Sequence, residues 1–156
     1  MSGDHASSVS APARTDRRHF GWAWMTLTLA LVIHLISEAG HNSISIYEQT
    51  AAAFHERLPF LPWPTFGWWL TGLAVTVLVL FALLPLAFRA GRWMRRAAYL
   101  FALWAALNAF AHLTEALRFS ATTGGTWSAM LLLVAAALLF VAARRVTPNH
   151  HLPFAP

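Results

Sequence analysis

Four long apolar runs alternate with short polar connections along the chain. The runs extend over about residues 20–43, 66–88, 97–117 and 127–143. Each is close to the roughly 20 apolar residues that an α-helix needs to cross a hydrocarbon core of about 30 Å. The pattern therefore predicts an all-α integral membrane protein, built as a bundle of four transmembrane helices.

The segments outside these runs predict tails and connections. Residues 1–18 and 147–156 are polar and have no apolar period, so we expect two flexible tails around one transmembrane domain at 19–146. The connection at 47–63 contains Pro59 and Pro62, and Pro64 follows it. Pro85 lies near the end of the second run, where we expect a kink because proline cannot donate a backbone hydrogen bond.

The arginines are unevenly distributed between the connections. Nine of the 11 lie in the N-terminal flank, in an expected basic loop at 89–96 and directly after the fourth run. The other two connections contain one each, Arg57 and Arg118. Because positive residues favour the cytoplasmic side, this predicts four spans in the cytoplasmic (inner) membrane, with both termini in the cytoplasm.

The composition agrees with this class and excludes others. The chain has 156 residues, of which 58% are hydrophobic and only 11% charged, and its mean hydropathy is +0.52. Soluble domains are about 25% charged. The absence of cysteine excludes disulfides and thiolate metal sites. The basic residues do not alternate with aromatic ones, so we expect no nucleic-acid partner.

Two sets of polar residues interrupt the apolar pattern, and in each set the residues are spaced four and then three apart. The first set is His34, Glu38 and His41, and the second is Asn108, His112 and Glu115. Such spacing places the side chains of each set on one helix face. A charge at the centre of a membrane costs about 2.5–3.5 kcal/mol on insertion scales, so ionisable residues there are functional candidates.

The two sets are expected at matching depth. At 1.5 Å per residue, they lie about 16–31 Å from the cytoplasmic ends of the first and third helices. These helices run in the same direction, so both sets fall in the outer half of the membrane. The loop that carries His55 and Glu56 emerges above them. We therefore expect one site, built from two helices and this loop.

A metal centre is the first interpretation of this site. Zn or Fe can be held by two histidines and one carboxylate. The candidate ligands are His34, Glu38, His41, His112 and Glu115. A di-iron centre would need glutamates from two further helices, and the second and fourth spans contain none.

Three other interpretations remain open. Glu38 and Glu115 could exchange protons with His34 and His112 in metal-free acid–base catalysis, suited to isomerisation, hydration or cyclisation of an apolar molecule. The two histidines could instead be axial ligands of a haem, which we rank lower. Finally, the polar groups could serve only to join helices by hydrogen bonds worth about 0.6 kcal/mol each.

The stretch from His34 to Glu38 resembles the motif of the HXXEE-domain family of small bacterial membrane proteins. That motif is His-x-x-Glu-Glu in the first span; here Glu38 matches the second Glu, and Ser37 stands at the first. A later His followed by a Gly-containing turn looks like His112 and residues 124–128. The resemblance implies a catalytic role for His34, Glu38 and His112. His34 and Glu38 are also similar to the His-x-x-x-Glu pair of the four-span emopamil-binding (EXPERA) group, which works on sterols.

These observations predict a membrane-embedded enzyme that acts on a lipid-like or isoprenoid-like substrate. The candidate activities are those of an isomerase, a hydratase, and a metal-dependent hydrolase or oxygenase. The alternative is a non-enzymatic module, either a proton-coupled transporter subunit or a bis-His haem protein. Expected partners are membrane lipid and an apolar small molecule. Gly72 and the small residues of the fourth span could also pack a homo-oligomer.

Overall fold

The structure is a computed structural model that describes residues 14–40, 48, 51–52, 55–57, 59–60, 65–119 and 125–146. Its long helices are α1 (Arg14–Gly40), α3 (Phe66–Ala82), α5 (Arg92–Phe119) and α6 (Thr126–Arg145), and the short helix α4 (Leu84–Ala87) follows α3. The described residues contain no strand. The all-helical prediction is confirmed for this part of the chain.

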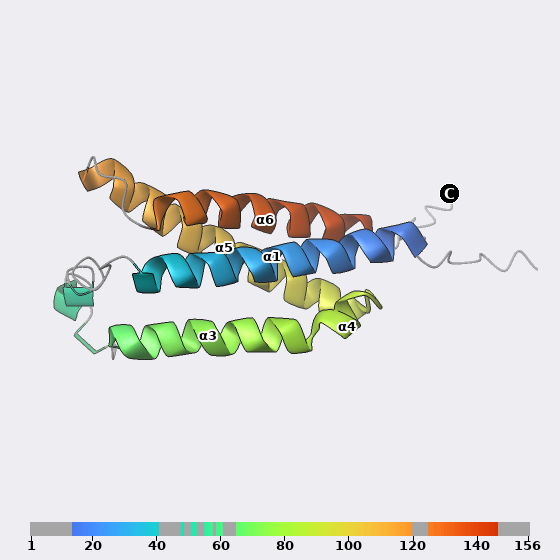
Figure 1. The fold of residues 1–156 in the computed structure, drawn as a ribbon, viewed down its shortest axis with the longest axis horizontal. Helices are drawn as coiled ribbons and strands as arrows, with labels where there is room; N and C mark the ends of the chain where they lie inside the picture. Colours follow the sequence, from blue (N-terminus) through green and yellow to red (C-terminus); the bar gives the residue numbers. More distant parts are fainter. Residues whose placement is uncertain are drawn as a thin grey trace, which may run out of the picture.

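The long helices form an elongated bundle in which α1 lies between α3 and α6 (Figure 1). Helices α1 and α5 run in the same direction, and α3 and α6 run in the opposite one. Helix α5 packs most extensively against α6. The start of α1 and the end of α6 therefore lie at the same end of the bundle, while α1 ends beside the start of α3.

Three of the helices, α1, α5 and α6, are long and apolar enough to cross a membrane. Helix α3 is apolar but shorter, with 17 residues. Many large apolar side chains are exposed on the outside of the bundle, among them Trp68, Leu117 and Trp127. Such a surface suits lipid rather than water. Length, composition and surface together indicate a helical membrane protein.

The predicted kink at Pro85 is confirmed as a break between α3 and α4. Helix α3 ends at Ala82, and Pro85 lies in the first turn of α4, where its missing N–H group is tolerated. The fully buried Trp24 of α1 donates a hydrogen bond from Nε1 to the carbonyl of Leu80, at 3.0 Å. This bond joins α1 to the last turn of α3.

Helix α5 begins at Arg92, inside the stretch that was expected to be a basic loop. Arginine is a good helix former, and its long side chain can carry the charge back to a polar surface. Arg95 also donates from Nη1 to the carbonyl of Val146 at 3.2 Å, just after the end of α6. The basic residues therefore extend the helix and connect it to α6.

Alanines form the contact between the helices in the centre of the bundle. On α5 the buried positions Ala98, Ala102, Ala105 and Ala109 recur at helical spacing. The small residues of α6 are buried in the same way, as Ala129, Ala135, Ala136 and Ala143. Small side chains let helix backbones approach closely inside a membrane. The small residues of the fourth span thus pack within this chain, whereas Gly72 is exposed.

Candidate functional site

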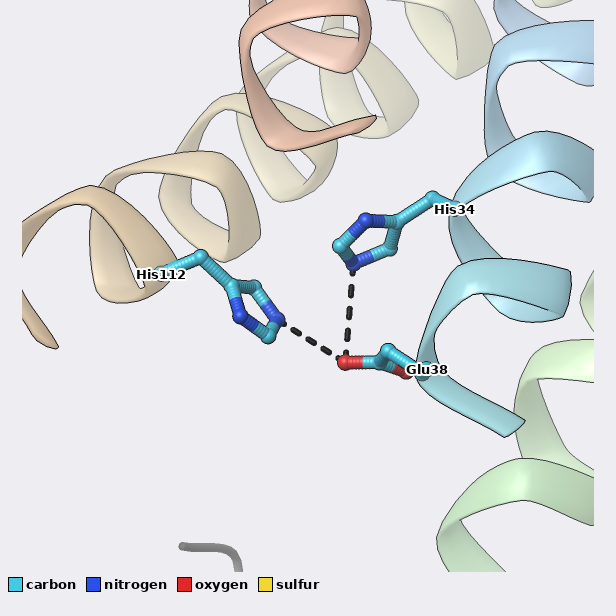
Figure 2. Close-up of side chains that lie close together, drawn as sticks. All are labelled: His34, Glu38 and His112. Atoms are coloured by element: carbon cyan, nitrogen blue, oxygen red, sulfur yellow. Dashed lines mark ion pairs between the residues drawn. The ribbon is translucent and has the colours of Figure 1, made fainter. Parts of the chain in front are cut away.

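Three ionisable side chains meet near the end of α1 (Figure 2). His34 and Glu38 come from α1 and are 0% and 5% exposed, and His112 comes from α5 and is half-buried. Their ligand atoms all lie within 4.8 Å of one another. The local spacing of four residues puts His34 and Glu38 on one face of α1, and helix packing brings His112 to them.

The Nδ1 atom of His34 is held by α6. It lies 2.9 Å from the hydroxyl oxygen of Ser128, which itself donates to the carbonyl of Gly125 at 3.0 Å. A serine hydroxyl has one proton, so its oxygen must accept the other hydrogen bond. His34 therefore carries a proton on Nδ1, and in the neutral ring the lone pair is on Nε2.

The Nε2 atom of His34 faces α5 and Glu38. Asn108 donates to it from Nδ2 at 2.9 Å. The same Nε2 atom lies 3.5 Å from Oε1 of Glu38. The ring thus directs its acceptor nitrogen into the group of ionisable residues, while its N–H points away from that group.

Glu38 connects the two histidines. Its Oε1 atom is 2.8 Å from Nε2 of His112, a hydrogen-bonding distance. Its Oε2 atom is buried and has no hydrogen-bond partner among the described residues. A buried carboxylate oxygen without a partner is costly, which makes it a candidate to bind an ion, a substrate group or a proton.

The three residues have a donor set that could hold a metal ion. Two ligand atoms in a tetrahedral zinc site lie about 3.3 Å apart, given Zn–N and Zn–O distances near 2.0–2.1 Å. The contacts of 2.8 and 3.5 Å made by Oε1 of Glu38 bracket this value. In addition, a metal-binding histidine usually donates its other N–H to a fixed acceptor, as His34 does to Ser128.

A porphyrin does not fit between the two rings in this arrangement. The imidazoles of His34 and His112 contact each other edge to face, with centroids 4.7 Å apart. A haem bound by both would have to separate the rings. The geometry therefore suits a single ion or a small polar group better than a bis-His haem.

The other predicted site residues have different places. Asn108 belongs to the site as the donor to His34. Glu115 is half-buried on α5, one turn beyond His112, and is not in the cluster of ligand atoms. His55 and Glu56 are exposed and are likewise not in it. His41 lies outside the described residues.

The residues that sequence reasoning missed lie at the start of α6. Ser128 is the only polar side chain within an otherwise apolar run, and that isolation was the available signal. Gly125 is needed for a close approach, since a Cβ atom there would lie 2.9 Å from Nδ1 of His112. Both residues therefore shape the site from α6, although neither is ionisable.

Comparisons with models of protein families, with curated proteins and with solved structures found no match for this chain.

Proposed function

We propose that the protein is a membrane-embedded, metal-dependent enzyme that acts on a lipid-like or isoprenoid-like substrate at His34, Glu38 and His112. The main support for this proposal is the convergence of two imidazole nitrogens and one carboxylate inside an apolar bundle, where Oε2 of Glu38 has no hydrogen-bond partner in the part of the chain that the structure describes. Ionisable groups are expensive in a membrane and are usually functional. The resemblance to the HXXEE-domain family implies a catalytic role for the same three residues.

The donor set favours Zn or Fe. In either case the ion would supply Lewis-acid polarisation of a substrate oxygen or activation of a bound water. Nε2 of His34 would be the ligand atom, because Ser128 holds the opposite nitrogen of the ring. The amide of Asn108, which hydrogen-bonds Nε2 in this structure, would have to turn away when an ion binds, since Nε2 has one lone pair. His112 is more exposed, with 16% of its side chain accessible, and is therefore better placed to meet substrate or transfer a proton.

Metal-free acid–base catalysis is the second candidate, and the 2.8 Å contact between Glu38 and His112 favours it. In that mechanism one partner gives a proton to the substrate and the other accepts one, as is required for an isomerisation. It uses the same residues, and the two mechanisms differ in whether an ion occupies the site.

The deciding experiment is elemental analysis of the protein purified in detergent. We expect about one equivalent of Zn or Fe per chain in the parent protein, and its loss in the H34A and E38Q variants, because each removes one of three protein ligands. The matched control is H55A, which removes an exposed histidine outside the ligand cluster.

Metal content at background level in the parent protein would exclude the metal-dependent mechanism and leave the acid–base one. Equal metal content in the parent and in both site variants would show that any ion is bound elsewhere in the chain.

A further inference from the structure

A groove separates α3 from α5 along the side of the bundle. Its volume is about 460 Å³, within the range of small-molecule sites. The lining includes Trp68, Trp69, Gly72 and Leu73 of α3 and Phe101 and Trp104 of α5. The groove exists because α3 packs mainly against α1, while α5 packs mainly against α6.

The surface of this groove is apolar. Among the residues that the structure describes, none that lines the groove is ionisable, and the hydroxyl of Thr76 donates to the carbonyl of Gly72 at 2.8 Å. Leu73 is 2% exposed and forms part of the wall, whereas Trp68 is 73% exposed and lies at the rim. The groove is therefore open sideways, where lipid would surround the bundle.

The groove ends at Trp104, and the candidate site begins one helical turn further along α5. Trp104, Asn108 and His112 follow one another at intervals of four residues, so they lie on one helix face. Trp104 lines the groove, Asn108 donates to His34, and His112 contacts Glu38. A step of four residues is a rise of about 6 Å, so His112 lies about 12 Å beyond Trp104 along the helix axis. A chain that continues from the groove along this face would meet the ionisable residues.

We propose that the groove binds one fatty-acyl chain of a bilayer lipid, whose polar end reaches His34, Glu38 and His112. This inference rests on the proposed function and names the substrate class. Acyl chains are the apolar groups that surround a groove open to the bilayer. Transfer from bilayer to groove gains no hydrophobic energy, so selection must come from packing against the aromatic rings and from the polar end.

Gly72 allows a direct test by filling the groove. It lines the groove, and a Cβ atom added there meets no atom within 4 Å. The G72L variant should therefore fold, since leucine is also the better helix former. The matched control is G67L, because Gly67 lies on the same helix with equally open surroundings and does not line the groove.

The probe is a phosphatidylcholine with a diazirine in one acyl chain, in liposomes that contain the purified protein. After illumination, labelled peptides are located by mass spectrometry. We expect labelling at Trp69, Phe101 or Trp104 in the parent protein, a several-fold loss in G72L, and no change in G67L. Equal labelling in all three proteins would overturn the proposal, as would groove labelling by a diazirine-bearing isoprenoid alcohol but not by the acyl probe.

The result is separable from that of the metal experiment. G72L should lose groove labelling while it retains the metal content of the parent protein, because Gly72 lies outside the group of metal ligands. Groove labelling by the acyl probe in a metal-free protein would exclude metal dependence but support the lipid site. Bound metal without selective groove labelling would support the metal site and overturn the acyl-chain site.

Discussion

The imidazole of His34 uses both of its nitrogen atoms, one toward α6 and the other toward α5 and Glu38. Ser128 fixes which nitrogen carries the proton, since its own hydroxyl is committed to the carbonyl of Gly125. A histidine fixed in this way keeps its Nε2 lone pair directed toward the ionisable residues, and only the hydrogen bond from Asn108 must be given up when an ion or a substrate group binds there. At the scale of single residues, the neutral hydroxyl of Ser128 therefore favours the tautomer of His34 that carries its proton on Nδ1.

Replacing Ser128 with alanine should weaken zinc binding by about 10–100-fold, as for other residues that orient a ligand histidine. The measurement is a chelator competition with purified protein. S128T should restore most of the affinity because it retains a hydroxyl. The control is T114A, since Thr114 donates to the carbonyl of Ala111 in its own helix turn and lies outside the ligand cluster. Unchanged affinity in S128A would show that Ser128 does not orient the site.

Helix α6 approaches α5 closely at its first residues, and this approach positions His112. Gly125 precedes the helix, and its missing side chain leaves room for the imidazole. Further along, alanines on both helices continue the close packing. The relative placement of these two elements thus depends on small residues at the turn and along the interface.

The G125A variant should displace His112, because the new Cβ atom would lie 2.9 Å from its Nδ1 atom. We expect the free energy of unfolding to fall by about 1–3 kcal/mol, as in other overpacked sites. We also expect reduced metal content. The readouts are thermal unfolding in detergent and elemental analysis. G91A is the control, since a Cβ atom there meets no atom within 4 Å. A G125A protein with both properties unchanged would contradict this role of the glycine.

At the scale of the whole molecule, the candidate site lies toward one end of the bundle, where α1 ends and α3 begins (Figure 1). We propose that this end faces the outside of the cytoplasmic membrane and that both termini are cytoplasmic. The arginine distribution supports this orientation, because most arginines lie near the opposite end of the helices. The proposal also requires α3, with 17 residues, to cross the membrane together with α4.

Single cysteines can test this topology, since the natural chain has none. Gly40 and Gly91 are exposed, and a side chain at either meets no neighbouring atom. A membrane-impermeant maleimide should label G40C in intact cells and G91C only after permeabilisation. Labelling of both in intact cells would show that α3 does not cross. Labelling of G91C alone would reverse the orientation.

The amino-acid sequence by itself determined the helices and the candidate residues within each of them. The lengths of the apolar runs and the position of His34 and Glu38 on one helix face follow from local periodicity. The break between α3 and α4 follows from Pro85, which lacks a backbone N–H group. It also indicated two matched polar sets, of which Asn108 and His112 do lie with the first set.

Only the tertiary structure decided which of these residues meet. Helical periodicity specifies a face within one helix, but the rotation and crossing of helices depend on packing between residues far apart in the chain. The structure therefore brings His112 to Glu38, adds Ser128 from α6, and leaves Glu115 out of the ligand cluster. The groove between α3 and α5 arises for the same physical reason, because each of these helices packs mainly against a different neighbour.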